Sequence, residues 1–415
     1  MYYYKYNNKY LFSKLKYDEF SQISKDDFIK GEFYYYLIKE DINKIKRSYI
    51  PNSPFMMHLK EEGIYLLNTN LFDKDIDLDN SLKKKLNDEK IKVINTNHKN
   101  FMDSINMDIK KEKYEITILG LGDVGGTLLS GLMLLAPSLF SKIKLYDLNL
   151  NNCKRWYYEA SQIYDAFDDL EYPQIEIIKE DEIFNSDVVI FCISAYIPKV
   201  GEKVDDVRMA QFKKNSSIIN NFGKMARNNN YKNLFCVVSD PIEPLCKSLY
   251  LSSNTNSKDE FDYNGIPSEN IIGFGLGVMN ARANFYSKNY KESLNFYKEG
   301  RAFGSHGKEL VIANSITNYN NDISINLTQD AIKANLVVRD VGFKPFIAPA
   351  LSSGAISIIN TLKGKWNYSA IYFKDSFYGC KNKRIKNTNK IESLNLDDDL
   401  YQRIKISYEN ISKII

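Results

Sequence analysis

Three glycines within one short segment have the spacing that most clearly indicates chemistry. Gly120, Gly122 and Gly125 follow an apolar run at residues 116–119 and precede a stretch with helical spacing at residues 127–140. In a strand-to-helix turn, the first glycine permits a tight bend, the second lets the main chain approach a pyrophosphate, and the third lets helix and strand pack closely. The helix would direct its N-terminal amides at the phosphates. The segment therefore predicts a nucleotide-binding turn.

An acid follows this turn near the separation that a ribose-binding carboxylate requires. Asp147 stands 25 residues after Gly122 and ends the next predicted strand, at residues 143–146. A carboxylate there can accept hydrogen bonds from an adenosine ribose diol and repels a 2′-phosphate, which favours NAD over NADP. A glycine-rich turn without a ligand is the alternative. Here, however, strand, glycines, helix, second strand and acid occur in the required order.

A histidine, an arginine and an aspartate are the remaining residues that suggest chemistry. His306 is one of three histidines and has glycines close on both sides, which would let backbone and ligand come close. Arg208 ends a polar segment, residues 194–208, that could close as a lid and bring an arginine to a carbonyl. Asp240 stands in a proline turn after a predicted strand. A structural or solvated side chain is the plainer alternative for each of them.

The elements that must position these residues alternate between strand and helix. Strands predicted at residues 116–119, 143–146, 188–193 and 234–238 are separated by helical stretches, as in a Rossmann-type, doubly wound parallel sheet of the α/β class. Ligands bind such sheets beyond the carboxyl ends of the strands. The residues expected at the cofactor are Gly120, Gly122, Asp123, Val124, Gly125, Asp147, Ser194, Ala195 and Ser239.

Residues 1–112 contain no glycine motif and have runs of aromatic residues, and they are predicted to form a small α+β extension. A strand is expected at residues 63–67, a charged helix at residues 78–89 and a short strand at residues 91–94. The extension could cover the mouth of the site, form an oligomer contact or bind another protein. The other two predicted domains are an NAD-binding domain at residues 113–270 and an α+β substrate domain at residues 271–415.

The composition is that of a folded protein without a pronounced charge. The chain has 415 residues, 44% of them hydrophobic, which is enough for packed cores. Its 56 basic and 52 acidic residues are mixed along the sequence, so we expect neither nucleic acid nor a membrane as partner. Five cysteines without a CxxC pair favour the reducing cytoplasm over a disulfide framework. We expect no secretory leader, no membrane span and no metal site.

The order of these motifs resembles the NAD-dependent lactate and malate dehydrogenase family over residues 113–415. No single motif decides the resemblance, because it rests on the ordered set. The set comprises the glycine turn at residues 120–126, Asp147, Val-Val-Ser-Asp-Pro at 237–241, Asn-Ala-Arg at 280–282, Gly-Ser-His-Gly at 304–307, Ala-Pro-Ala-Leu-Ser at 348–352, Phe-Tyr-Gly at 377–379 and a final helical segment from residue 394.

The resemblance implies a role for each of the reactive side chains. His306 would exchange the proton on the substrate oxygen, and Arg282 would clamp the substrate carboxylate in a bidentate pair. Arg208 stands seven residues before Asn215, as the family's loop arginine does, and would stabilise negative charge on the carbonyl oxygen. Lys199 would contact substrate from the same loop. The implied substrate is a small 2-hydroxy or 2-oxo acid, the hydride would belong to NAD, and family members are commonly dimers or tetramers.

The chain departs from its relatives at the residue that orients the histidine. Relatives carry an aspartate three residues before the carboxylate-binding arginine, where this chain has Met279, and a thioether cannot hold an imidazolium. A second departure is Asp240, which replaces an asparagine. We hypothesise that Asp240 has taken over the pairing with His306. The same carboxylate could instead face a cationic or amino-bearing substrate.

Two further departures concern the substrate loop. Tyr196 stands where relatives usually have a glycine close to the cofactor, and Lys199 replaces their usual basic or polar residue. The loop from Pro198 to Arg208 is also about three residues longer than in relatives, so substrate specificity does not carry over.

Three functions compete. A dehydrogenase of 2-hydroxy acids is favoured, because random sequence change without selection for catalysis would not retain Arg208, Arg282 and His306 together. A catalytically impaired protein that senses NAD(H) or serves as a scaffold would account for Met279 and Tyr196. A nucleotide-dependent glycosidase fits less well, since the serine–aspartate–proline and histidine segments follow the dehydrogenase pattern.

Overall fold

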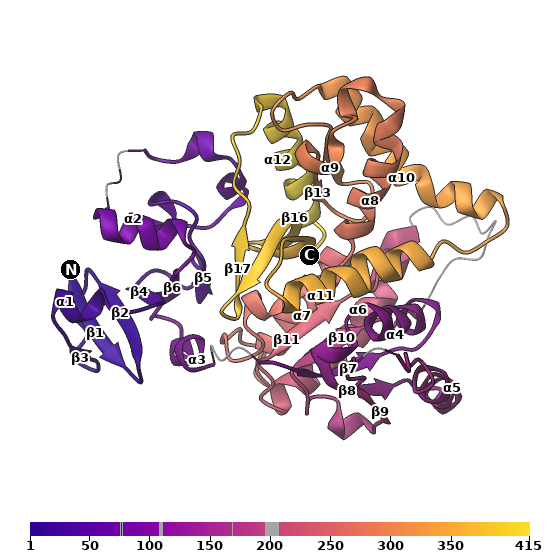
Figure 1. Cartoon of the computed structure of the whole chain (residues 1–415), viewed down its shortest axis with the longest axis horizontal. Helices are drawn as coiled ribbons and strands as arrows, with labels where there is room; N and C mark the ends of the chain where they lie inside the picture. The colour runs from indigo at the N-terminus through magenta and orange to yellow at the C-terminus, as the bar shows by residue number, and fades with distance from the viewer. Residues whose placement is uncertain (75, 77, 108–110, 168, 196–206) are drawn as a thin grey trace.

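The computed structural model describes residues 1–74, 76, 78–107, 111–167, 169–195 and 207–415, and the side chains of residues 207–210 stand outside this description. The described strands form two sheets (Figure 1). One has six strands and lies within the extension, and the other has eleven strands and runs through the rest of the chain.

The sheet of the extension is mixed, in the order β3-β1-β2-β4-β6-β5. Strands β2, β4 and β6 are parallel, whereas the remaining pairs are antiparallel. The helix and the strand predicted at residues 78–89 and 91–94 are confirmed as α2 and β6. The elements are β1 (Tyr2–Tyr6), β2 (Lys9–Ser13), β3 (Ser21–Gln22), α1 (Lys25–Phe28), β4 (Tyr34–Ile38), β5 (Ser48–Tyr49), the 3₁₀ helices η1 (Phe55–His58), η2 (Ile64–Leu67) and η3 (Thr69–Leu71), α2 (Asn80–Asn87), β6 (Ile91–Asn95) and α3 (Phe101–Asn106).

The strand predicted at residues 63–67 is wrong. This segment forms the 3₁₀ helix η2, in which the Leu66 amide donates to the Gly63 carbonyl oxygen at 3.1 Å. Both leucines of η2 are buried against the core. A short apolar run does not distinguish a strand from one buried helical turn, which explains the error.

The second sheet begins with six parallel strands in the order β9-β8-β7-β10-β11-β12. Counted along the chain, this is the order 3-2-1-4-5-6 of a dinucleotide-binding fold, so the predicted Rossmann-type architecture is confirmed. The elements are β7 (Tyr114–Leu119), α4 (Asp123–Leu135), η4 (Pro137–Leu139), β8 (Phe140–Tyr146), α5 (Leu150–Ala160), β9 (Gln174–Ile177), η5 (Glu180–Glu182), β10 (Val188–Phe191), α6 (Val207–Asn228), β11 (Leu234–Val237), α7 (Ile242–Asn254), η6 (Ser268–Asn270) and β12 (Ile271–Gly273).

The helix predicted at residues 127–140 exists with different ends. Helix α4 begins at Asp123, directly after Gly122, and ends at Leu135 before Pro137. Proline cannot continue a helix, and Phe140 already belongs to β8. Helix α4 therefore begins within the glycine-rich segment, and its N-terminal amides lie at the turn that follows β7.

Antiparallel strands of the second half extend the same sheet. Strand β12 pairs with β15 through Gly273 and Ala370, and the order continues β15-β16-β13-β14, with β17 on β16. The elements are α8 (Leu276–Tyr286), η7 (Ser287–Asn289), η8 (Lys291–Ser293), α9 (Phe296–Glu299), β13 (Arg301–Gly304), β14 (Leu310–Ala313), α10 (Asn321–Asp340), the π-helical turn η9 (Pro349–Ala355), α11 (Ile356–Leu362), β15 (Asn367–Phe373), β16 (Ser376–Ile385), β17 (Thr388–Ile391) and α12 (Asp398–Ser412).

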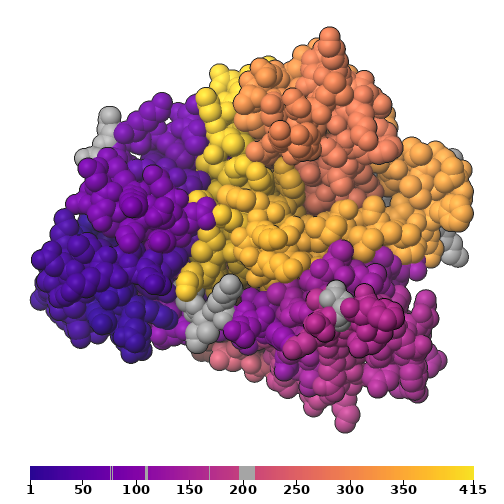
Figure 2. Space-filling model, in the orientation of Figure 1, coloured from indigo at the N-terminus to yellow at the C-terminus, as the bar shows by residue number. Residues whose placement is uncertain are grey.

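The extension shares its core with the rest of the molecule. One buried apolar cluster includes Phe12 and Leu67 of the extension, Leu145 of β8 and Ile404 of α12. Figure 2 shows the indigo extension packed against the yellow C-terminal residues. Burial of this kind is the main favourable term in folding, so the extension is part of the folded unit.

The extension contacts the sheet at the amino ends of its parallel strands. The Arg47 Nε atom lies 2.9 Å from Glu269 Oε1, and the Ser48 hydroxyl donates to the same oxygen at 3.0 Å. Glu269 stands in η6, which leads directly into β12. Ligands bind at the opposite, carboxyl ends, so these contacts do not place the extension over the mouth of the predicted site.

Over the ranges that the structure describes, no helix is both long enough and apolar enough to cross a membrane.

Candidate active site

The glycine turn between β7 and α4 is tight on one side and open on the other. Gly120 has a φ of +87° and donates its amide to the Tyr146 carbonyl oxygen at 2.9 Å. A Cβ atom at Gly125 would overlap the Gly120 carbonyl oxygen, whereas one at Gly122 would meet no atom within 4 Å. Gly122 therefore leaves open space at the N-terminus of α4, where a pyrophosphate can approach the amides.

Asp147 at the end of β8 is tied to the glycine turn. Its Oδ2 accepts the Leu121 amide at 2.7 Å, and its Oδ1 accepts the Asn149 amide at 2.8 Å. A carboxylate has about four lone-pair positions, so these two bonds leave acceptor capacity for a ribose diol. The bonds also fix the direction of the side chain relative to the turn.

Two further predicted cofactor residues lie in the first turn of α4. Asp123 pairs with Lys344 at 3.0 Å, and both side chains are well exposed. Val124 is half-buried and follows directly. Exposed pairs of this kind contribute at most about 1 kcal/mol, so the link between α4 and the segment after α10 is weak.

Asn215 of α6 joins the loops that leave β10 and β11, a function that the sequence analysis missed. Its Oδ1 accepts the Ala195 amide at 2.9 Å, and its Nδ2 donates to the Asp240 carbonyl oxygen at 2.8 Å. The side chain is completely buried. A buried asparagine seven residues after a candidate arginine was the available signal, but the residues that it bridges are distant in sequence.

Ser239 and Ser194 mark the carboxyl ends of β11 and β10. The Ser239 hydroxyl is buried and has no hydrogen-bond partner among the residues that the structure describes. A buried hydroxyl that lacks a partner costs free energy, and a bound polar ligand would restore the bond. Ser194, by contrast, is exposed.

His306 lies in the turn between β13 and β14 and meets Asp240. The two side chains are joined by Nδ1 and Oδ1 at 3.1 Å, although the residues are 66 positions apart. The His306 side chain is 16% exposed and that of Asp240 is 46% exposed. Because an ionised carboxylate only accepts hydrogen bonds, this contact requires the proton on Nδ1.

Glycines allow the close approach at His306. Gly304 has a φ of +89°, which an L-residue rarely adopts, and it directs the chain into the turn. A Cβ atom at Gly275 would lie 2.9 Å from the His306 Cβ. The start of α8 and the turn that holds the histidine are therefore in direct contact.

Arg282 of α8 belongs to the same group of side chains. Burial lowers the pKa of Arg282, and the charge of Asp240 acts in the opposite direction, so the two charges lie within reach of each other. The guanidinium donates from Nη1 to the Met279 sulfur at 3.4 Å. Met279, one turn earlier on α8, is buried in an apolar cluster. The structure thus brings His306, Asp240 and Arg282 together.

The remaining predicted site residues are described only in part. Arg208 lies in the first turn of α6, but its side chain stands outside the described residues, as do Tyr196 and Lys199 altogether. The predicted lid at residues 194–208 falls largely on the same segment. In the part of the chain with described placement, no cluster of three or more histidine, cysteine or acidic side chains could hold a metal ion.

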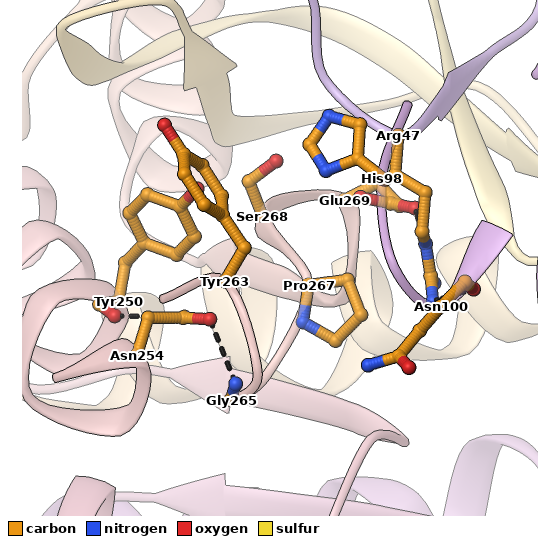
Figure 3. Close-up of a pocket in the computed structure, with 10 residues that line it drawn as sticks. All are labelled: Arg47, His98, Asn100, Tyr250, Asn254, Tyr263, Gly265, Pro267, Ser268 and Glu269. Carbon is orange, nitrogen blue, oxygen red and sulfur yellow. Dashed lines mark hydrogen bonds and ion pairs between the residues drawn. The ribbon is translucent and has the colours of Figure 1, made fainter. Parts of the chain in front are cut away.

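Two cavities elsewhere in the molecule are lined by neither His306 nor Asp240. The first, of about 20 Å³, lies where Arg47, His98 and Asn100 of the extension face Tyr263 and Glu269 (Figure 3). That volume holds one or two water molecules and no substrate. The second, of about 270 Å³, lies between α8, η9, α11 and the β15–β16 strands.

Comparison with known proteins agrees with the dinucleotide-binding fold. The family model for the NAD-binding domain of lactate/malate dehydrogenase matches residues 114–262. No curated protein matches the chain. Among solved structures, the minor L-lactate dehydrogenase of Enterococcus mundtii in its ligand-bound form has a TM-score of 0.60 at 15% identity and covers 74% of this chain and 99% of its own.

Two other solved structures are similar to the same extent. A lactate dehydrogenase from a Medee basin deep-sea metagenome library has a TM-score of 0.59 at 14% identity, covering 73% of this chain and 98% of its own. The malate dehydrogenase of Archaeoglobus fulgidus in complex with NADH has a TM-score of 0.55 at 17% identity, covering 72% and 97%. The family model shows that residues 114–262 match the NAD-binding domain of the lactate/malate dehydrogenase family. The strand order and the solved structures show that most of the chain shares the fold of these enzymes.

Proposed function

We propose that the chain is an NAD(H)-dependent oxidoreductase that interconverts a small 2-hydroxy acid and the corresponding 2-oxo acid. The observation that carries the proposal is the group formed by His306, Asp240 and Arg282 at the carboxyl edge of a dinucleotide-binding sheet. A proton-exchanging ring and a carboxylate-binding guanidinium beside a nucleotide turn are the two protein groups that this reaction needs.

The turn between β7 and α4 supports NAD(H) as the cofactor. Gly122 leaves space at the N-terminus of α4, and the Asp147 carboxylate retains acceptor capacity beside it. The Ser239 hydroxyl, without a partner among the described residues, suits a polar group of the cofactor or substrate. When bound, the nicotinamide supplies the site that accepts or donates hydride.

The chain's own residues would handle the proton and the substrate carboxylate. Nε2 of His306 would take the hydroxyl proton in oxidation and return it in reduction. Arg282 would hold the carboxylate through two parallel hydrogen bonds, which fixes the position of the reacting carbon. Arg208, at the start of α6, would stabilise negative charge on the carbonyl oxygen, and Lys199 would contact the substrate.

The test is NADH oxidation with a panel of 2-oxo acids, beside calorimetric titration with NADH. We expect turnover of at least one acid, and His306→Gln should lower kcat by about 10²- to 10⁴-fold without weakening NADH binding. His58→Gln places the same substitution in the extension and is the control. Binding of NADH without turnover of any acid would refute the proposed activity and leave a sensor of the nucleotide.

We further propose that the protein is a cytoplasmic homo-oligomer, a dimer or tetramer. Apolar side chains at the end of α10 and after it are exposed, among them Val337, Val341 and Phe343. Apolar surface of this kind commonly marks a protein interface. All five cysteines are free thiols, as is usual in a reducing compartment. Light scattering coupled to size-exclusion chromatography would measure the mass, and a monomer would refute the oligomer.

A further inference from the structure

We propose that Asp240 is the positioning residue for His306, so that the orienting carboxylate comes from the end of β11 and not from α8. The inference rests on the proposed function and assigns the substrate-facing nitrogen of the histidine. Its first support is direct, because Oδ1 of Asp240 lies 3.1 Å from Nδ1 of His306.

The main chain of Asp240 is held in place independently of His306. Asn215 donates to its carbonyl oxygen at 2.8 Å and accepts the Ala195 amide at 2.9 Å. The asparagine is completely buried, which fixes its own position between the two loops. The carboxylate therefore starts from a fixed backbone position, as an orienting group must.

The α8 side of the group offers no substitute carboxylate among its described contacts. Met279 faces the Arg282 guanidinium, and its thioether is only a weak acceptor. A thioether carries no charge that could offset an imidazolium. The ionised Asp240 carboxylate carries a negative charge, accepts a hydrogen bond from Nδ1–H and stabilises positive charge on the ring.

The pairing determines which nitrogen meets the substrate. With the proton held on Nδ1, the Nε2 lone pair is the basic one and can take the hydroxyl proton of a 2-hydroxy acid. In the reverse direction, Nε2–H returns that proton to the carbonyl oxygen, while Asp240 remains ionised and steadies the imidazolium. A histidine with the other tautomer would present an N–H donor where a base is needed.

The same carboxylate also sets the binding of the substrate. Asp240 acts on the charge of Arg282, the proposed partner of the substrate carboxylate. An incoming acid meets a guanidinium whose charge Asp240 partly offsets, and it approaches a second negative group. The Asp240 carboxylate therefore favours turnover but opposes binding of the acid. Loss of its charge should lower kcat and also lower KM for the acid.

The tautomer of His306 is measurable without any activity. Nitrogen NMR of histidine-labelled protein distinguishes Nδ1–H from Nε2–H, and His306→Gln identifies the signal among three histidines. We expect Nδ1–H in the native protein and a shift toward Nε2–H in Asp240→Ala. Met279→Leu should leave the tautomer unchanged, and the His58 and His98 signals serve as internal controls.

Kinetics with Asp240→Asn complete the test, because the amide keeps the shape and an acceptor oxygen but loses the charge. We expect kcat to fall by about 100-fold or more and KM for the acid to fall several-fold. A general loss of structure would raise KM instead. Thermal melting checks that both variants are folded.

The outcomes separate this inference from the proposed function. If the native protein turns over an acid while Asp240→Ala keeps both its Nδ1–H tautomer and its kcat, Asp240 does not orient His306. If Asp240→Ala changes the tautomer but no acid is turned over by the native protein, the pairing stands and the dehydrogenase assignment fails.

Discussion

At the scale of single residues, Gly122 and Gly125 lie three positions apart and have opposite surroundings. A Cβ at Gly125 would overlap the Gly120 carbonyl oxygen, whereas one at Gly122 would enter open space. Gly125 is thus required by the fold, because the turn and α4 pack there without room for a side chain. The packing of the chain does not require a glycine at Gly122, so the reason for a glycine there is the approach of a ligand.

This contrast predicts different defects for two identical substitutions. Gly122→Ala should leave the melting temperature within about 2 °C of the native value, because the new methyl contacts no protein atom, but weaken NADH binding by about 10-fold or more. Gly125→Ala should lower the melting temperature by several degrees, since overpacking costs about 1–3 kcal/mol. Calorimetric titration and thermal melting measure both quantities. Unchanged NADH affinity in Gly122→Ala would place the nucleotide elsewhere.

At the scale of elements, helix α6 connects the cofactor edge to the proposed proton-exchanging pair. Asn215 is the connection, because the oxygen and the nitrogen of its side-chain amide bond the loops after β10 and β11. The loop after β11 then carries Asp240 to His306.

Asn215→Ala should therefore impair both stability and turnover. It leaves a backbone amide and a carbonyl without their partner, at about 1–3 kcal/mol for each group that stays unsatisfied. Urea denaturation should show that loss in the free energy of unfolding, and kcat should fall because Asp240 is no longer held. Ser216→Ala, on the exposed face of the same helix, should change neither quantity appreciably. Equal effects of the two substitutions would show that the bridge is not specific.

The strands of the parallel sheet could be predicted from the sequence because their burial leaves a pattern within each strand's own residues. Side chains buried on both faces give continuous apolar runs, and those at residues 116–119 and 234–238 are strands in the structure. The start of α4 could not be placed, since its first turn begins at Asp123 within the glycine-rich segment that was interpreted as a loop. The 3₁₀ helix η2 shows the same limit for a run of only a few residues.

Only part of the candidate site could be predicted from the sequence. The glycine turn and Asp147 are close in sequence, so their spacing carried the prediction. The contact of Asp240 with His306 was a hypothesis drawn from two departures from a family pattern, and only folding brings these residues to 3.1 Å. The spacing from Arg208 singled out Asn215 but not its bridge, because the two loops that the side chain joins are distant from it in sequence.

At the scale of the whole molecule, the extension is attached through a buried ion pair. Arg47 and Glu269 lie 222 positions apart, which no local pattern could predict, and Glu269 is 1% exposed. Burial raises the pKa of Glu269, but the Arg47 guanidinium, a backbone hydrogen bond and the charge of His98 together hold that pKa below its ordinary value. The carboxylate is therefore charged in the folded protein at neutral pH.

The lowered pKa makes the attachment sensitive to acid. A carboxyl whose pKa is lower in the folded than in the unfolded state stabilises the fold above its ordinary pKa, about 4.3, and this contribution is lost as pH falls through the folded value. Glu269→Gln should cost about 3–5 kcal/mol at neutral pH, because it leaves the buried Arg47 charge without its partner. It should also flatten the decline of stability below about pH 4.3, since the group that takes up the proton is gone.

The exposed pair Lys16–Asp18 provides a control for this prediction. Its two charges are also 2.9 Å apart, but the side chains are 62% and 86% exposed. Asp18→Asn should leave the free energy of unfolding nearly unchanged at any pH, because solvent screens such a pair. Urea denaturation across the pH range compares the two variants. Equal costs would mean that burial of Arg47 and Glu269 contributes nothing, and that the extension is held by its apolar contacts alone.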